Sequence, residues 1–207
     1  MCGRYVVTNA VAKTKGLVKS TIKVEDSENY NAHPQQMLPV IKKYTNGNTL
    51  ENLEWGIVPR WAKKYDFKPL INARLETINE KISFKKLIQL NKCVVVADGF
   101  YEWKRDEKNK IPHYFVREDK KTMFIAGIFD QNQFCLITEQ ANENLKSIHH
   151  RQPVILNEKE INKYLDLQLN GSIFLKEKQK INLNFYEVSK DVNKPTTNNL
   201  SLIQKLS

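Results

Sequence analysis

The feature that most constrains the fold of this chain is a series of short strand-forming runs, each closed by a turn. Residues 37–43 and 49–55 flank Asn46-Gly47, a strong signal for a tight β-hairpin. Residues 93–97 form a continuous apolar run that predicts a central strand, and Gly99 interrupts this pattern before it resumes. Further strands are predicted at residues 100–104, 113–116, 123–129, 134–138 and 185–189.

Helical patterns are fewer. Residues 78–90 carry apolar side chains at helical spacing, which predicts a helix there, and residues 142–148 predict a shorter one. Asn157 followed by Glu160 resembles a capping arrangement that opens a helix over residues 158–167. The pattern predicts an α+β or mainly β domain with one sheet system and a few peripheral helices.

The charge of the chain indicates the kind of partner that it binds. Its 33 Lys and Arg residues against 23 Asp and Glu give a formal net charge of +10 and a pI near 9.4. A basic excess of this size favours nucleic acid or another anionic surface as the partner. A Lys-rich composition throughout the source proteome is the alternative explanation. The length of 207 residues fits a single domain spanning residues 1–207.

Several classes of protein are excluded by what the sequence lacks. It has no apolar run of about 18 residues and no secretory signal pattern, so we expect no membrane contact and a cytoplasmic location, nucleoid-associated in a bacterium. Cys2, Cys93 and Cys135 are too few and too scattered for a disulfide framework, and no CxxC pair suggests a metal. No glycine-rich phosphate-binding motif is present, so no cofactor is expected.

The N-terminus is chemically unusual because a small residue, Cys2, follows the initiator Met1. Removal of Met1 is expected, and it would leave an amine and a thiol on adjacent carbons. The α-amine has an ordinary pKa of about 8, so a usable fraction is neutral and nucleophilic near pH 7. The amine can condense with an aldehyde to an imine, and the thiol can then close a five-membered thiazolidine ring. An internal cysteine cannot do this.

Several multi-residue blocks accompany Cys2 along the chain. They are Met1-Cys2-Gly3-Arg4-Tyr5, Tyr30-Asn31-Ala32-His33-Pro34, Trp55-Gly56-Ile57-Val58-Pro59-Arg60-Trp61, Asn72-Ala73-Arg74-Leu75-Glu76-Thr77, Asp98-Gly99-Phe100-Tyr101-Glu102-Trp103 and His149-His150-Arg151-Gln152-Pro153-Val154-Ile155-Leu156. This set resembles the SRAP family (SOS-response-associated peptidase domain), whose members crosslink to abasic DNA. The resemblance spans residues 2 to about 190 and implies antiparallel sheets that form a barrel-like core.

The resemblance implies catalytic roles for Cys2, Asn72, Glu102 and His149. Cys2 would be the nucleophile toward the open-chain aldehyde of an abasic sugar. Glu102 would shuttle protons, because a carboxyl in a partly apolar pocket has a raised pKa. His149 would protonate the sugar ring oxygen or the departing 3′ group, since imidazole titrates near neutral pH. Asn72 would hold the sugar by hydrogen bonds.

Two residues depart from the family pattern beside these positions. His150 stands where Asp is common, which leaves open how His149 and His150 share the work, although the His-x-Arg-x-Pro spacing favours His149. Gln152 stands where Met or Arg is common. Neither change falls on a residue that the resemblance makes catalytic.

The predicted DNA-binding residues are Arg4, Arg74, Thr77, Trp61 and Arg151. Arg4 and Arg74 are expected to grip phosphates through the planar guanidinium fork, while a buried ion pair is an equal alternative for Arg151. Trp61 is expected to stack on bases, and core packing is the stronger expectation for Trp55. Nearby positive charge would come from Lys63, Lys64 and Lys68.

The sequence therefore predicts a monomeric sensor that captures abasic sites in single-stranded DNA through Cys2, with no cofactor and no metal. A cysteine peptidase using Cys2, His149 and Glu102 is the first alternative, and it would turn over an added peptide. We expect any proteolysis to be limited to autoprocessing, in which the protein removes its own Met1. A non-catalytic nucleic-acid binding module is the second, and its binding would be salt-sensitive and indifferent to the lesion.

Overall fold

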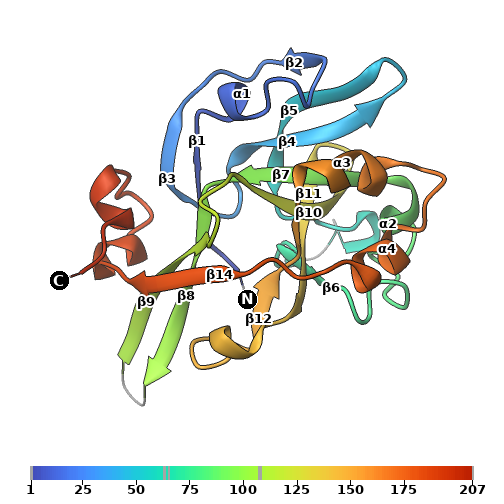
Figure 1. The fold of residues 1–207 in the computed structure, drawn as a ribbon. Coiled ribbons are helices and arrows are strands. Elements are labelled where there is room, and N and C mark those ends of the chain that lie inside the picture. The colour runs from blue at the N-terminus through green and yellow to red at the C-terminus, as the bar shows by residue number, and fades with distance from the viewer. Residues whose placement is uncertain (1, 63, 65, 107–108, 207) are drawn as a thin grey trace.

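The predicted β-hairpin is present in the structure. A computed structural model describes residues 2–62, 64, 66–106 and 109–206, and its backbone is shown in Figure 1. Strands β4 (Met37–Tyr44) and β5 (Gly47–Trp55) pair antiparallel, with Tyr44 opposite Gly47. Gly47 has a φ of 119°, a conformation that side chains other than glycine rarely adopt. The tight turn predicted at Asn46-Gly47 is therefore confirmed.

The strands of the middle of the chain close into a ring. β4 pairs with β7 (Lys92–Ala97), β7 with β10 (Met123–Asp130), and β10 with β11 (Gln133–Gln140), all antiparallel. A short parallel pairing of β11 with β5 completes the circuit, in which Phe134 lies opposite Trp55. The predicted barrel-like core and the mainly β fold class are confirmed.

A second antiparallel sheet lies beside this ring (Figure 1). Its strand order is β14-β9-β8-β1-β3, and β1 begins three residues after Cys2. The strands are β1 (Tyr5–Thr8), β3 (Glu28–Ala32), β8 (Gly99–Asp106), β9 (Asn109–Arg117) and β14 (Leu183–Glu187). β14 begins and ends two residues earlier than predicted, while β1 and β3 were not predicted.

Four short strands extend the ring. β2 (Ser20–Ile22) runs parallel to β5, and β13 (Ile155–Leu156) pairs with β10. β6 (Asn72–Arg74) and β12 (Arg151–Pro153) both pair with the second half of β11. β11 thereby brings together two segments that are far apart in the sequence, and both carry predicted site residues.

One predicted helix is confirmed. Helix α3 (Glu158–Leu165) starts with the expected capping box, because Asn157 and Glu160 exchange side-chain and backbone hydrogen bonds. It ends two residues before the predicted terminus, since Asp166 is extended. The remaining short helices are α1 (Ala10–Lys13), α2 (Leu87–Leu90), α4 (Gly171–Glu177), η1 (Arg60–Ala62), η2 (Glu143–Leu145), η3 (Lys190–Asn193) and η4 (Leu200–Ile203). Within the described ranges, no helix has the length and apolar character needed to cross a bilayer.

Two predicted helices are wrong over most of their length. Between residues 78 and 86 the chain forms successive turns, and only α2 at its end is helical. Ile82 is 76% exposed although it was assigned to the apolar face, whereas the core takes Phe84 instead. Residues 142–148 contain only η2, because the bond from Ala141 N–H to the carbonyl of His150 brings the ends of this loop together.

Most buried apolar side chains lie in the main core cluster, which includes the strands of the closed ring. Trp55 is fully buried there, and the centroid of its indole lies 5.0 Å from the centroid of the Tyr5 aromatic ring. The prediction that Trp55 packs in the core is therefore confirmed. A smaller apolar cluster under the second sheet joins Val6 and Tyr101 to Val192 and Leu202 of the C-terminal segment. The two clusters lie on either side of the second sheet, so β1 and β8 have buried side chains on both faces.

The chain passes from the ring to the second sheet at one point, where β7 ends and β8 begins. A Cβ atom on Gly99 would lie 2.3 Å from the carbonyl oxygen of Phe115, so only glycine permits this close approach. Asp98, the single residue between the strands, accepts hydrogen bonds from the backbone and hydroxyl of Thr8 and pairs with Lys13. This junction fixes where Glu102 lies relative to Cys2.

Candidate active site

Cys2 lies at the entrance to β1 and is held on both sides. Its side chain is 1% exposed, and its thiol lies 3.8 Å from the carbonyl oxygen of Arg4. Its own carbonyl oxygen accepts a 2.8 Å hydrogen bond from the amide of Asn72. Burial raises the pKa of the Cys2 thiol, and the negative charge of Glu102 raises it further. The resting group is therefore a thiol rather than a thiolate.

Glu102 projects from β8 toward the interior. Side chains alternate along a strand, so Glu102 shares its face with Phe100, which belongs to the main core, whereas Tyr101 belongs to the opposite cluster. Its side chain is only 4% exposed, and burial raises the pKa of its carboxyl. The neighbouring aromatic residues thus contribute unequally, with Phe100 lying on the side of the carboxyl.

His149 stands at the end of the loop of residues 141–149, which we call the histidine loop. Its Nδ1 lies 3.8 Å from Oε1 of Glu102 and accepts a 3.0 Å hydrogen bond from the backbone N–H of Arg151. Nδ1 also lies 3.2 Å from the carbonyl oxygen of Arg151. Burial lowers the pKa of the His149 imidazole to about 4, so the ring is neutral at pH 7. The near-neutral titration expected from the sequence is not what this environment gives.

The structure also distinguishes the two adjacent histidines. The ring of His150 stacks on that of His149, with centroids 4.5 Å apart. His150 is exposed, whereas His149 is the ring beside Glu102. His150 instead lines a shallow pocket of about 230 Å³ together with Arg74, Lys146 and others. The geometry favours His149 as the imidazole of the site, as the spacing predicted.

Asn72 approaches Cys2 from the other side. It belongs to β6, where it pairs with Leu136 of β11. Its Nδ2 holds the Cys2 carbonyl, while its Oδ1 is buried and makes no hydrogen bond to any residue that the structure describes. Buried polar atoms nearly always find a partner, so an acceptor in this condition is typical of a place where a ligand binds.

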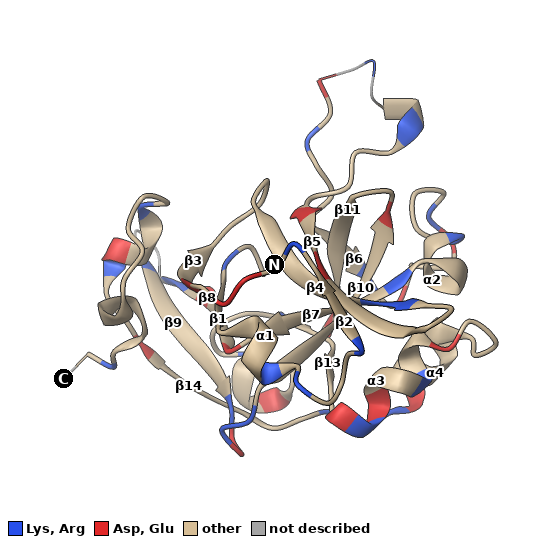
Figure 2. Cartoon of the chain, turned by 90° about the horizontal axis from the view of Figure 1, so that it is seen from above, with Lys and Arg blue, Asp and Glu red and all other residues tan. Residues whose placement is uncertain are grey.

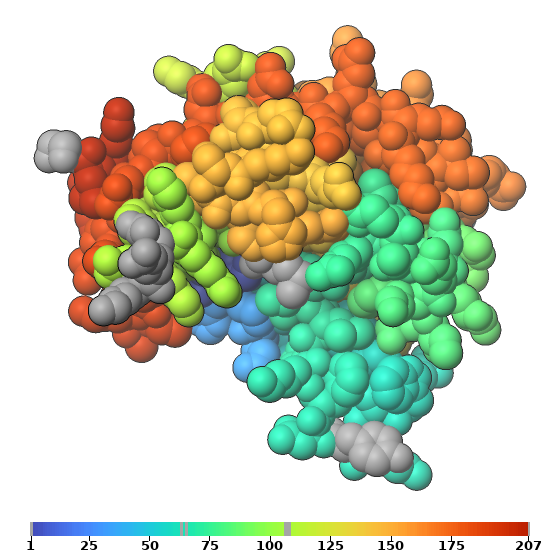
Figure 3. All heavy atoms as spheres, turned by 90° about the horizontal axis from the view of Figure 1, so that it is seen from below, coloured from blue at the N-terminus to red at the C-terminus, as the bar shows by residue number. Residues whose placement is uncertain are grey.

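These groups meet in a depression on one face of the molecule. Figure 3 shows the start of the chain, in dark blue, at the bottom of a hollow. Around it lie the lime segment near residue 102, the yellow-orange histidine loop and the teal segment that follows β6. The four predicted catalytic residues come from four separate parts of the sequence, and contacts link them: Asn72 bonds to the Cys2 carbonyl, the charge of Glu102 acts on the Cys2 thiol, and His149 lies 3.8 Å from Glu102.

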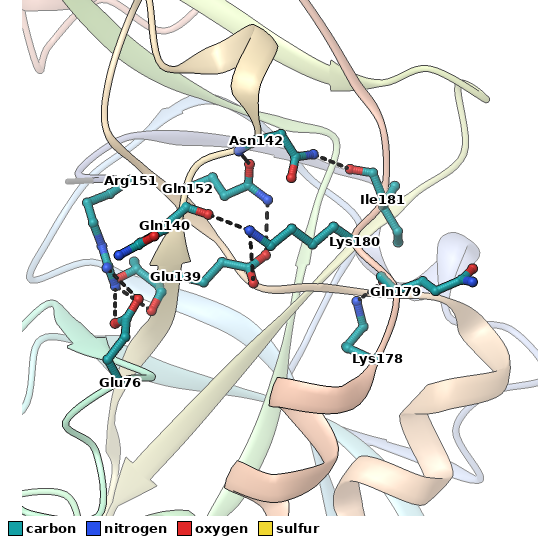
Figure 4. Close-up of polar contacts among 11 residues, drawn as sticks. Glu76, Glu139, Gln140, Asn142, Arg151, Gln152, Lys178, Gln179, Lys180 and Ile181 are labelled. Atoms are coloured by element: carbon teal, nitrogen blue, oxygen red, sulfur yellow. Dashed lines mark hydrogen bonds and ion pairs between the residues drawn. The ribbon is translucent and has the colours of Figure 1, made fainter.

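The predicted arginines differ in how they are held. Arg4 donates hydrogen bonds to Asn31 Oδ1 and to the carbonyl of Val192, which tethers the C-terminal segment beside Cys2. Arg74 is exposed at the rim. Arg151 is buried, and its guanidinium makes bidentate bonds to Glu76 and a 2.7 Å bond to the carbonyl of Thr138 (Figure 4). The alternative of a buried ion pair therefore describes Arg151.

Trp61 lies apart from the hollow, on a projecting segment. Residues 57–70, which we call the aromatic segment, are joined at the base by the pairing of Ile57 with Leu70, and the segment extends away from both sheets in Figure 2. Trp61 is 56% exposed and meets Phe67 edge to face at 5.4 Å. Lys64 and Lys68 are exposed there, and Lys63 lies outside the described residues. Thr77 is half-buried in the turn after β6.

Three residues that support the site were not singled out from the sequence. Phe67 packs on Trp61, Glu76 holds Arg151, and Asn31 holds Arg4 while donating to three carbonyls of the C-terminal segment. Glu76 and Asn31 both lie inside the quoted sequence blocks. An acid two residues after Arg74, in a strongly basic chain, was the available signal for Glu76.

The fold is a mainly β protein, and its candidate active site combines a buried cysteine, a carboxyl and an imidazole at the junction of a closed barrel and a second sheet. The chain belongs to the SOS response associated peptidase (SRAP) family, whose model matches residues 1–195. No group of three or more His, Cys, Asp or Glu side chains suited to a metal occurs within the described part of the chain.

Similar proteins cover most or all of the chain. The abasic site processing protein YoqW of Bacillus subtilis is 31% identical, with 99% of each chain aligned. The abasic site processing protein YedK of Escherichia coli is 29% identical over 83% of this chain and 82% of its own. A crystal structure of a Bacteroides thetaiotaomicron protein superposes with a TM-score of 0.81 at 22% identity over the full length of both chains. This last likeness supports the fold.

Proposed function

We propose that this protein processes abasic sites by capturing them in single-stranded DNA, through a covalent thiazolidine link to Cys2 after Met1 is removed. The observation that carries the proposal is the position of Cys2, whose buried thiol feels the charge of Glu102, while His149 lies 3.8 Å from that carboxyl. The names of its relatives, abasic site processing proteins, supply the substrate class.

The reaction needs only protons and water. The α-amine nitrogen of Cys2 bonds to the aldehyde carbon of the open sugar and loses two protons, while the carbonyl oxygen leaves as water and an imine remains. The sulfur of Cys2 then bonds to the imine carbon, and the thiol proton passes to the nitrogen. The product is a thiazolidine. Because the thiol pKa is raised, this second step starts from S–H and needs a base nearby.

Glu102 and His149 divide the proton transfers in this scheme. Glu102 has a raised carboxyl pKa, so it can hold a proton at a pH where an exposed glutamate cannot, and it can give and take protons at the amine and the thiol. His149 is neutral, and in the tautomer whose Nδ1 accepts from the backbone N–H of Arg151, its Nε2–H would donate to the ring oxygen of the closed sugar as the ring opens. Asn72 Oδ1 would accept a hydrogen bond from the sugar.

DNA would lie over the hollow and its rim. Arg74 and Arg4 would contact phosphates, with Thr77 beside them, and the exposed ring of Trp61 would stack on a base. Arg151 has its guanidinium bound to Glu76, so its part is to fix the strand that follows His149. The net charge of +10 would favour association with the strand. The protein would act as a monomer without a cofactor.

A denaturing gel tests the proposal. The Met-processed protein is incubated with a single-stranded oligonucleotide that carries one abasic site, beside the Cys2→Ala variant and an undamaged oligonucleotide. A slower band only with wild type and abasic DNA supports covalent capture by Cys2. The same band with Cys2→Ala would overturn the mechanism. No band, combined with turnover of an added peptide, would favour a cysteine peptidase.

A further inference from the structure

Gln152 links the two strands behind the histidine loop. It belongs to β12 and its side chain is buried, at 2% exposure. Its Oε1 accepts a 2.9 Å hydrogen bond from the backbone N–H of Asn142, and its Nε2 donates a 3.0 Å bond to Oε1 of Glu139 (Figure 4). We infer that Gln152 is a positioning residue, which fixes the histidine loop and thereby holds His149 against Glu102. The inference rests on the proposed function.

The chemistry of these partners leaves only one orientation for the amide. The backbone N–H of Asn142 can only donate, and an ionised carboxylate of Glu139 can only accept. A side chain with one acceptor and one donor at opposite ends of a planar group satisfies both. Methionine could make neither bond, and arginine could not accept from Asn142.

The loop is fastened on its outer side as well. Lys180 Nζ donates to the carbonyl of Gln140 at 2.9 Å and lies 3.9 Å from Glu139 Oε2. The side-chain amide of Asn142 donates to the carbonyl of Ile181 at 3.4 Å. Figure 4 shows these groups gathered on one side of the strand pair, where Gln152 is the member that reaches the loop from β12. The start of the loop is therefore fixed by β12 and by residues 180–181.

Neighbouring residues of β12 act on opposite faces. Successive side chains alternate across a strand, and Arg151 bonds to Glu76 on one face while Gln152 bonds to Glu139 on the other. The backbone N–H of Arg151 itself donates to the imidazole of His149. A shift of β12 or of the loop would therefore move the ring. Displacements of about 1 Å in a catalytic group can cost about a hundredfold in rate.

The test compares Gln152→Met with a matched control. Asn48 is also a buried amide, 8% exposed, which donates to the carbonyl of Leu17 and to Asn162, far from the site in the β4–β5 hairpin region. Asn48→Leu should lose comparable hydrogen bonds without touching the histidine loop. Both variants are assayed as full-length, Met-processed protein at a temperature where each is folded, with saturating abasic oligonucleotide.

Two readouts are needed. We expect Gln152→Met to form the crosslink about tenfold more slowly. We also expect the pKa of the His149 imidazole, measured by NMR, to rise by about one unit toward its ordinary value, because a loosened loop admits water. Asn48→Leu should change neither. A wild-type crosslinking rate together with an unchanged His149 titration in Gln152→Met would overturn the inference.

A second pair of variants protects against a failure of Gln152→Met to fold. Glu139→Gln still offers an oxygen to Gln152 and should keep the wild-type rate and titration, whereas Glu139→Leu should reproduce the loss. Equal behaviour of these two variants would contradict the bridge. If wild type itself forms no crosslink, the proposed function fails, while the titration still decides whether Gln152 positions His149.

Discussion

The histidine loop and the aromatic segment differ in how they are bonded to the rest of the protein. The loop of residues 141–149 is bonded at its start to Gln152 and residues 180–181, and at its end to Arg151. The aromatic segment, residues 57–70, is joined at its base by the pairing of Ile57 with Leu70 and presents Trp61 at 56% exposure. His149, by contrast, is only 19% exposed.

This difference fits two tasks in one reaction. Proton transfer requires the imidazole to stay within hydrogen-bond reach of the reacting atoms, so a fastened loop suits it. Stacking on unpaired bases tolerates many geometries because every base has an aromatic face, so an exposed ring on a projecting segment suits that task. Substitutions in the first region should therefore change the rate of capture, and those in the second should change DNA affinity.

The largest effect is expected from the groups that transfer protons. His149→Gln and Glu102→Gln should each slow crosslink formation by about a hundredfold or more at saturating DNA, since a positioned acid or base is worth about 10² to 10⁴ in rate. Their affinity for undamaged single-stranded DNA should stay within about twofold of wild type. Rates from quenched denaturing gels check this. A normal rate in both variants would remove the proposed division between the two regions.

Arg151, in the strand that follows the histidine loop, offers a second test. Arg151→Met removes the bonds to Glu76 and Thr138, and we expect a loss of about 2 kcal/mol in the free energy of unfolding. The matched change Arg74→Met at the exposed rim should cost less than about 0.5 kcal/mol, yet lower the salt dependence of DNA binding by about one charge. Urea denaturation and salt titrations measure both. Equal stability losses would show that Arg151 is not structural.

Trp61→Ala tests the second region. Loss of one base-stacking ring should weaken binding of single-stranded DNA about tenfold, in keeping with about 1–3 kcal/mol per stacked base. The crosslinking rate at saturating DNA should not change. Tyr44→Ala serves as the control, because Tyr44 is an aromatic residue of similar exposure, 44%, on the distant β4–β5 hairpin. Fluorescence anisotropy that shows the same loss in both variants would contradict a specific role for Trp61.

A separate effect is a dependence of stability on pH. The pKa of His149 is about 4 in the folded protein against 6.5 ordinarily, so the unfolded chain binds more protons between these values. The His149 contribution to stability is therefore present above about pH 6.5 and is lost as the pH falls toward 4. Thermal unfolding of His149→Gln should decline less than that of wild type over this range. Parallel declines would mean that the ring titrates normally.

The middle of the fold was predictable from the sequence because its strands are long and apolar. β7 and β10 appear as continuous apolar runs, and Asn46-Gly47 fixes the hairpin. β3 and β6 were missed because their few residues are polar or mixed, and pairing with neighbours rather than propensity makes them strands. The helix predicted over residues 78–90 failed because Ile82 lies outside the core.

The candidate site was predictable as a set of residues, through family resemblance, but not as a geometry. The sequence could not show that Glu102 faces the ring core with Phe100, or that burial lowers the pKa of His149. These properties depend on contacts between residues far apart in the chain, such as that of His149 with Glu102. Arg151 shows the same limit, since the sequence left a buried ion pair and a phosphate contact equally open and did not indicate Glu76 as the partner.

The most direct test of the account is the mass spectrum of the crosslinked N-terminal peptide after the bound DNA has been digested. Capture by the 1,2-aminothiol of Cys2 predicts a peptide that begins at Cys2, without Met1, and carries the sugar on both its nitrogen and its sulfur, so that alkylating reagents no longer label the thiol. An adduct on a lysine, or a crosslinked peptide that retains Met1 or an alkylatable Cys2, would contradict the thiazolidine mechanism.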